Sequence, residues 1–234
     1  MINTFDIAMR QSAEDVGCRP DDFLRDENTV LIFSPSDDAK VYLRKPQDFL
    51  LIKYGRGAVV AVCEKIYDRV RGHFSGNGNS DLSSLSELGL TPSFTTMCFL
   101  PSDHMTALPC RYKTRVLGPD RFNELYLPEW ENALCKKRRE LDMLAVGAYD
   151  GDRLVGLAGA SADCAEMWQI GIDVLPEYRR QGIASALTSQ LAVEIKDRGK
   201  LPFYSAEFYN IASMKNAHKS GFIPAWIQIQ ADLG

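Results

Sequence analysis

Residues 174–184 read Val-Leu-Pro-Glu-Tyr-Arg-Arg-Gln-Gly-Ile-Ala and lie between an apolar run typical of a strand and an amphipathic run typical of a helix. Within this stretch, Arg179, Gly182 and Ala184 follow the spacing Arg-x-x-Gly-x-Ala. The first turn of a helix has unpaired N–H groups and the positive end of the helix dipole, so such an entry suits a phosphate group. Gly182 lets the backbone approach that group, and Ala184 keeps the next position small.

The segments that flank this loop give it a structural context. Met167–Val174 predicts the strand before it, and Gly182–Arg198 predicts the helix after it, with apolar residues at four-residue spacing. Further on, Phe203–Phe208 predicts a strand, and Asn210 is a suitable N-cap for a helix through Lys219. Trp226–Ala231 alternates apolar and polar residues, as an exposed or edge strand does.

Upstream of the loop, two apolar runs are joined by Asp150-Gly151-Asp152, which is a strong hairpin signal. These runs are Met143–Tyr149 and Leu154–Ala160. Before them, Asp120–Glu140 predicts a helix with a kink or break at Pro128. The C-terminal half therefore alternates helices and strands in a mixed order, which predicts an α/β (α+β) fold with a mixed sheet and helices packed against it.

The N-terminal part mixes the same two kinds of segment. Thr29–Phe33 and Phe49–Lys53 predict short buried strands, and Ala58–Val70 predicts a helix. A run of Gly, Asn and Ser at Ser75–Ser80 is the best candidate for an internal boundary.

Composition excludes several classes of function. The chain has 234 residues and a net charge of −4, so no basic character indicates a nucleic-acid partner. Residues 1–10 lack the apolar region of a signal peptide, and no apolar run approaches the length of a membrane span. The six cysteines form no C-x-x-C pair, so we expect reduced thiols in a cytoplasmic protein with no metal site.

The Arg179–Ala184 loop resembles the acyl-coenzyme A (CoA) pyrophosphate loop of the GNAT superfamily of acyltransferases. The order of elements from Met143 to about Ala231 is similar to that family. A second local match is Asn210-Ile211-Ala212-Ser213 followed by Gly221-Phe222, which looks like the family's Asn-x-x-Ala/Ser…Gly-Phe block. The resemblance implies a GNAT-like fold with an additional N-terminal α/β region.

The resemblance also implies a cosubstrate, acetyl-CoA, and a set of residues that would bind it. In the family, the strands before the loop and after the helix splay apart, and the pantetheine arm lies between them. Carried onto this chain, the implied acetyl-CoA-binding residues are Ile172, Val174, Arg179, Arg180, Gln181, Gly182, Ile183, Ala184, Ser185, Asn210 and Ser213.

One departure from the family concerns the proton donor. The family often places a Tyr seven residues after the Asn, as the acid that protonates the leaving thiolate, but here that residue is Ala217. His218 is adjacent, and an imidazole is a side chain suited to proton transfer, although one residue along a helix turns the side chain by about 100°. Tyr209 and Tyr204 are other hydroxyl donors nearby in sequence, and either also suits a core position.

The base that would take a proton from the amine is equally open in the sequence. Glu166, Asp173 and Glu207 are the carboxylates near the strands expected to splay. Glu207 ranks first because it lies on the strand after the helix, although a solvated strand carboxylate is an equally good interpretation. Water could also relay the proton. The catalytic candidates are therefore Glu207, His218 and Tyr209.

These patterns together predict an N-acetyltransferase that transfers an acetyl group from acetyl-CoA to a primary amine by direct attack. The expected division is an N-terminal region, 1–90, which is a degenerate GNAT-like half or a cover for the acceptor site, and a GNAT-like domain, 91–234. One alternative is a non-catalytic acyl-CoA sensor or regulatory module, and another is an interaction protein without a cofactor. The acceptor is expected to be a small molecule or a peptide, and its identity does not follow from the fold. A homodimer is a further possibility that the sequence does not decide.

Overall fold

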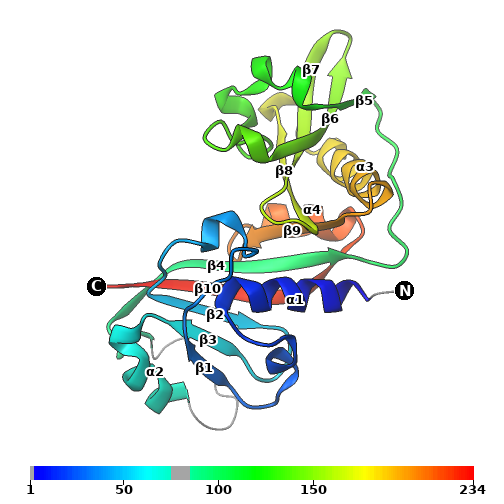
Figure 1. Ribbon diagram of the computed structural model, residues 1–234. Coiled ribbons are helices and arrows are strands. Elements are labelled where there is room, and N and C mark those ends of the chain that lie inside the picture. Colours follow the sequence, from blue (N-terminus) through cyan, green and yellow to red (C-terminus); the bar gives the residue numbers. More distant parts are fainter. Residues whose placement is uncertain (1–2, 75–84) are drawn as a thin grey trace. The chain divides into compact units, whose positions relative to one another are not determined.

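The structure is a computed structural model that describes residues 3–74 and 85–234. It divides into two compact units (Figure 1). The first unit comprises Met1–Cys98, Ala206–Tyr209 and Pro224–Gly234, and the second comprises Phe99–Ser205 and Asn210–Ile223. The predicted boundary at Ser75–Ser80 lies outside the described residues, and the proposed division at residue 90 stays a prediction.

The first unit is built on a mixed sheet with the strand order β1-β3-β2-β10-β4. Strand β1 pairs parallel with β3, whereas β2 pairs antiparallel with both β3 and β10. The elements with most of their residues in this unit are α1 (Thr4–Val16), β1 (Thr29–Ile32), β2 (Phe49–Lys53), β3 (Val59–Val62), α2 (Tyr67–Phe74), β4 (Leu90–Pro101) and β10 (Phe222–Leu233).

Both faces of this sheet are buried at the central strands β2 and β3. Phe49 and Leu51 point to one face and join a core cluster with Val70 and Phe74 of α2. Leu50 and Ile52 alternate with them, point to the other face, and are also buried. Helix α1 is joined to the residue that follows β2, because Ser12 Oγ and Tyr54 Oη form a hydrogen bond of 2.9 Å.

The second unit is built on strands in the order β9-β8-β7-β6-β5, all antiparallel except the parallel pair β8 and β9. The predicted hairpin at Asp150-Gly151-Asp152 is confirmed, with Gly151 at a φ of +59°. The elements are β5 (Lys113–Leu117), β6 (Asp142–Asp150), β7 (Arg153–Ser161), β8 (Met167–Val174), α3 (Ile183–Asp197), β9 (Leu201–Glu207) and α4 (Ile211–Lys219).

Helix α3 covers one face of this sheet, as Figure 1 shows. Its approach to β7 is close, because a Cβ on Gly156 would lie 2.8 Å from Ile183 Cγ2 and 3.2 Å from Leu187 Cδ1. On the other face, Gly159 and Gly171 make room for the backbone of residues 132–133, whose carbonyl oxygens would lie within 1.9 Å of a Cβ at either glycine.

The predicted helix over Asp120–Glu140 is wrong. This segment consists of single 3₁₀ turns whose apolar residues Phe122, Trp130 and Leu134 pack in one cluster. The backbone N–H groups of Asn132, Ala133 and Cys135 do not pair along a helix, because they donate to the carboxylates of Asp173 and Asp142. The 3₁₀ turns of the described chain are at Pro20–Leu24, Val41–Leu43, Glu64–Ile66, Pro119–Arg121, Asn123–Leu125, Pro128–Trp130, Arg139–Leu141 and Pro176–Tyr178.

One further prediction is wrong, and another is wrong in part. In Ala58–Val70, the fully buried run Val59–Val62 forms strand β3, and a helix begins only at Tyr67. A β-branched run that is buried on both faces suits a central strand better than a helix. The predicted strand Trp226–Ala231 is confirmed as part of β10, but it is neither exposed nor an edge strand, because β10 lies between β2 and β4 in the first unit. Trp226 and Ile229 are both 3% exposed.

Candidate functional site

The loop between β8 and α3 has an unusual backbone. Arg180 has a φ of +62° and Gly182 a φ of +81°, both in the left-handed region. Gly182 is the N-cap of α3, and no side chain in the described structure forms a capping hydrogen bond with the start of this helix. A Cβ at Gly182 would meet no atom within 4 Å, so the space beside the residue is open.

This geometry has the properties of an anion-binding site. The first N–H groups of α3 carry the partial positive charge of the helix dipole, and no side-chain oxygen caps them. A turn with left-handed residues can orient successive N–H groups toward one point. Arg180 is exposed and adds a full positive charge. The loop therefore suits a phosphate or pyrophosphate group.

Two other side chains of the loop hold its shape. Arg179 Nε donates to the carbonyl oxygen of Val174 at 3.0 Å, so this guanidinium ties the loop back to the end of β8. Gln181 Oε1 accepts hydrogen bonds from Tyr112 Oη at 3.0 Å and from Arg111 Nη1 at 3.3 Å. Arg111 and Tyr112 precede β5, and the sequence carried no signal for their contact with Gln181.

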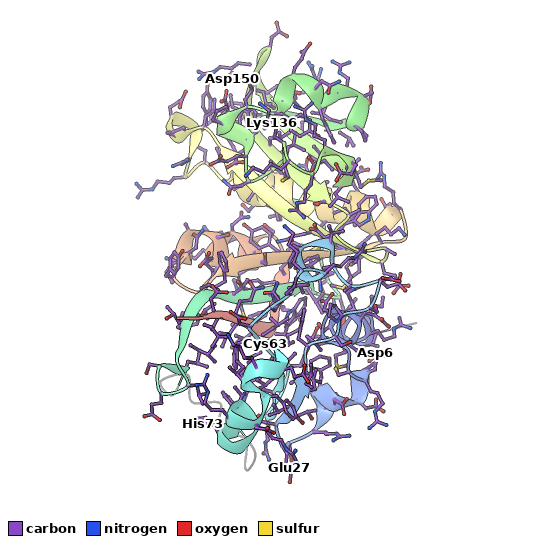
Figure 2. All side chains as sticks on the ribbon, turned by 60° about the vertical axis from the view of Figure 1, so that its left-hand side comes forward. Asp6, Glu27, Cys63, His73, Lys136 and Asp150 are labelled. Atoms are coloured by element: carbon purple, nitrogen blue, oxygen red, sulfur yellow. The ribbon has the colours of Figure 1, made fainter. Side chains whose placement is uncertain are left out.

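Tyr178 fixes the turn from the other side. Its hydroxyl donates to Asp150 Oδ2 at 2.9 Å, at the end of β6, where Figure 2 labels Asp150. The same bond raises the pKa of Tyr178. The ring of Tyr178 also lies edge-on to that of Tyr112, with 5.7 Å between the ring centroids. Polar and aromatic contacts with the ends of β6 and β8 and with the segment before β5 thus support the start of α3.

Strands β8 and β9 pair only at their beginnings. Within the described residues their register runs from Met167↔Leu201 to Ile170↔Tyr204 and ends there. Strand β8 continues to Val174 and remains paired with β7 on its other side. Residues 171–174 of β8, which include the predicted ligands Ile172 and Val174, therefore turn one edge away from any strand partner. Such an edge can hydrogen-bond an extended, amide-bearing ligand.

Helix α4 carries the other predicted ligands. The predicted N-cap is confirmed, because Asn210 Oδ1 accepts from the backbone N–H of Ser213 at 3.0 Å. Ser213 Oγ lies 2.7 Å from Tyr204 Oη. Ala217, where the family often has a tyrosine, is 0% exposed, and His218 is on the exposed side of the helix.

The other candidate catalytic residues are Asp173, Glu207 and Tyr209, and they lie in different surroundings. Asp173 accepts hydrogen bonds from both backbone and side chain of Asn132 and from the backbone of Ala133, at 2.7–3.0 Å, so it anchors a loop. Glu207 and Tyr209 belong to the first unit. A hydrogen bond to Glu207 raises the pKa of the exposed Tyr209, which therefore holds its proton more tightly.

Two further features of the described chain concern membrane-spanning helices and the state of the cysteines. Over residues 3–74 and 85–234, no helix is long and apolar enough to span a membrane. The six cysteines are free thiols, and burial raises the pKa of Cys98 to about 12.

The chain was compared with known proteins. No curated protein matches it significantly. Solved structures with a similar fold include a GCN5-related N-acetyltransferase-like protein from Streptococcus suis, with 19% identity, a TM-score of 0.52, and coverage of 81% of this chain and 86% of that one. A GCN5-related N-acetyltransferase from Sphaerobacter thermophilus has 15% identity, a TM-score of 0.51, and coverage of 78% and 75%.

A GNAT-family acetyltransferase from Colwellia psychrerythraea has 16% identity, a TM-score of 0.50, and coverage of 67% of this chain but 63% of that protein. At these identities the likeness shows the fold, which is the mixed α/β fold predicted from the sequence. Residues 106–222 also match the model of the acetyltransferase (GNAT) family. Since this match includes β8, the loop, α3 and α4, the chain belongs to the GNAT family of acetyltransferases.

Proposed function

We propose that this protein is an N-acetyltransferase that transfers an acetyl group from acetyl-CoA to a primary amine of a small molecule or peptide. The observation that carries the proposal is the start of α3, where left-handed Arg180 and Gly182 precede a helix that no side chain caps. That arrangement suits a pyrophosphate, and family membership points to acetyl-CoA as its source.

The residues of the second unit fit the parts of this cosubstrate in turn. The backbone of Gly182, Ile183, Ala184 and Ser185, with the Arg180 side chain, would hold the pyrophosphate. The edge of β8 that has no strand partner, at Ile172 and Val174, and the side chain of Asn210 would hold the pantetheine arm. Arg179 and Gln181 would act by holding the loop, because their polar groups already contact Val174 and Tyr112. Acetyl-CoA, when bound, supplies an activated thioester.

The protein would then contribute position and proton transfer. Backbone N–H groups of β8 would stabilise the oxyanion that forms as the amine attacks. Glu207 is our candidate for the base, since it is half-buried and carries a carboxylate at the end of β9. His218 and Tyr209 keep their predicted roles in proton transfer as alternatives to be tested. We further propose that residues 1–90 shape the acceptor site.

A second candidate function is a non-catalytic acyl-CoA sensor, and the observation that favours it is Ala217. This residue is fully buried, so the chain lacks a proton-donating side chain at the position where the family often has one. Loss of a positioned acid typically costs about 10²–10⁴ in rate, which would suffice to make a binding protein.

The two candidates are separated by one assay with a matched control. Release of CoA thiol from acetyl-CoA is measured over a panel of primary amines, including amino acids, polyamines and peptides. Acetylation of at least one amine, lost in the Gly182→Glu variant, supports the enzyme. Binding of acetyl-CoA without thiol release over the whole panel would instead establish the sensor.

A further inference from the structure

The hydroxyl groups of Tyr204 and Ser213 form a pair at the point where β8 and β9 part. Tyr204 is the last residue of β9 in register with β8, and its Oη lies 2.7 Å from Ser213 Oγ in the first turn of α4. Tyr204 is 3% exposed, whereas Ser213 is half-buried. Ser213 is therefore the member of the pair that a bound molecule could reach.

The distance between the two hydroxyl groups allows either to be the donor, and the burial of Tyr204 favours one direction. Burial raises the pKa of Tyr204, so its phenol keeps its proton at neutral pH. Side-chain hydrogen bonds with Ser213 and Asn216 act against burial and lower this pKa. A buried phenol that keeps its proton needs an acceptor, and among the described residues Ser213 Oγ is the acceptor within hydrogen-bond distance of Tyr204 Oη, so we take Tyr204 as the donor.

Other contacts hold these groups rigidly. Asn216 Nδ2 donates to Thr188 Oγ1 of α3 at 3.0 Å, which joins α4 to α3. The Tyr204 ring packs against Phe99 and Phe222, with centroid distances of 6.4 Å and 6.0 Å. Among the described residues no acceptor other than Tyr204 Oη lies in hydrogen-bond contact with Ser213 Oγ. The Ser213 proton is thus left for an acceptor outside the protein.

The alternatives on α4 are less suitable. Ala217 has no polar atom and is fully buried. The hydroxyl of Ser220, the residue that follows α4, is used internally, because its Oγ donates to the carbonyl oxygen of Asn216 at 2.7 Å. His218 is exposed. Ser213 is consequently the hydroxyl of α4 that is both oriented by a partner and open to a ligand.

We propose that Ser213 is a catalytic residue that donates a hydrogen bond to the sulfur of the departing thiolate, and that Tyr204 is its positioning residue. This rests on the proposed acetyl transfer. In that step the amine nitrogen forms a bond to the acyl carbon, the carbon–sulfur bond breaks, and its electron pair goes to sulfur. The proton that the amine loses neutralises the thiolate through solvent, so Ser213 and Tyr204 keep their own protons.

The test compares Ser213→Ala, Ser213→Thr and Tyr204→Phe with wild type, using an amine that wild type acetylates. We expect Ser213→Ala to lower kcat by at least ~10-fold, since a lost donor at a developing anion typically costs about 10²–10³. The KM for acetyl-CoA and the rise in melting temperature with CoA should not change. Ser213→Thr keeps a hydroxyl and should recover most of kcat.

A double-mutant cycle tests the positioning role of Tyr204. Tyr204→Phe retains the ring packing and should lower kcat in wild type, but should add nothing to Ser213→Ala, because it acts through that hydroxyl. Ser220→Ala is the matched control, because Ser220 directly follows α4 and its hydroxyl is used internally, and it should leave kcat unchanged.

The possible failures are distinct. A Ser213→Ala enzyme with wild-type kcat, or additive effects of the two substitutions, would overturn this proposal and leave acetyl transfer intact. A wild type that binds acetyl-CoA and acetylates no amine would overturn the proposed function on which it rests.

Discussion

Gly182 and Gly199 bracket helix α3 and allow its two ends to be compared. Both have a positive φ, +81° and +72°, and at neither would a Cβ meet an atom within 4 Å. A substitution by alanine therefore introduces the same kind of backbone strain at each, of order 1 kcal/mol, without a steric clash. The two positions differ in that only Gly182 lies at the end of the helix that suits an anion.

We expect Gly182→Ala and Gly199→Ala to lower the melting temperature by similar amounts, but only Gly182→Ala to weaken acetyl-CoA binding, by about tenfold or more. Isothermal titration of each variant with acetyl-CoA measures this. Equal affinities in the two variants would place the cosubstrate away from the start of α3.

Because the carboxyl group of Asp142 is buried, we expect the stability of the protein to depend on pH in a specific way. It is 2% exposed, and burial raises its pKa from 3.8 to about 6, against the opposing hydrogen bond from the Cys135 N–H. The folded state binds this proton more tightly than the unfolded state does. The contribution of the proton to the free energy of unfolding is therefore complete below the ordinary pKa of 3.8 and is lost as pH rises through about 6.

We expect Asp142→Asn to raise the melting temperature at pH 7.5 and to flatten its decline between about pH 4 and pH 6. An asparagine Oδ1 can still accept from Cys135. Differential scanning fluorimetry from pH 4 to pH 8 is the measurement, and parallel profiles for wild type and variant would show that Asp142 does not titrate as stated.

At the scale of single residues, the sequence predicted what depends on local spacing. The loop before α3 and the cap at Asn210 follow from motifs of a few residues. The hydroxyl pair of Tyr204 and Ser213, and the support of Gln181 by Tyr112, arise from tertiary packing between segments distant along the chain. No periodicity or motif of this chain encodes such contacts.

At the scale of helices and strands, the segment between β5 and β6 shows how a side-chain carboxylate can accept the backbone hydrogen bonds that a helix would otherwise form. Its 3₁₀ turns lie against β7 and β8, and the carboxylate of Asp173 accepts from Asn132 and Ala133. Asp173, which the sequence suggested as a catalytic base, is thus engaged in holding this segment.

Replacing Asp173 by alanine leaves those N–H groups without their acceptor, at a cost of about 1–3 kcal/mol for a buried donor and less where water replaces it. We expect a lower melting temperature and a kcat close to wild type in whatever protein remains folded. Asp197→Ala, an exposed carboxylate on α3, is the control for charge and should change stability little. A variant of Asp173 with normal stability and no activity would restore its candidacy as the base.

The elements that were predicted correctly have strong local signals. The β6–β7 hairpin has Asp-Gly at its turn, and α3 and α4 have a clear start and end in the sequence. The errors at β3 and β10 have a common cause. Both strands are paired on two sides and buried, so neighbours rather than alternation along the strand determine their environment.

At the scale of the whole molecule, the order of strands determines where the chain can be cut into fragments that fold. In the first unit, β10 at the C-terminal end pairs with β2 from Ile227↔Lys53 to Ala231↔Phe49. A fragment of residues 91–234 would contain β10 without this partner, and the buried side chains of Trp226 and Ile229 would lose their cover.

We therefore expect the 91–234 fragment to aggregate or to unfold without cooperativity, measured by gel filtration and thermal denaturation. A monomeric fragment that melts cooperatively and acetylates the same amines as the full chain would show that residues 1–90 are dispensable for folding and for the acceptor site.

The central claim is that the loop from Arg179 to Ser185 holds acetyl-CoA. The most direct test is the melting temperature of wild type and Gly182→Glu, with and without acetyl-CoA. A ligand at 100 times its Kd stabilises the native state by about 2.7 kcal/mol, so a clear rise is expected in wild type. The variant puts a carboxylate into the open space beside Gly182 and should show no rise. An unchanged melting temperature in wild type, or an equal rise in both proteins, would contradict the account.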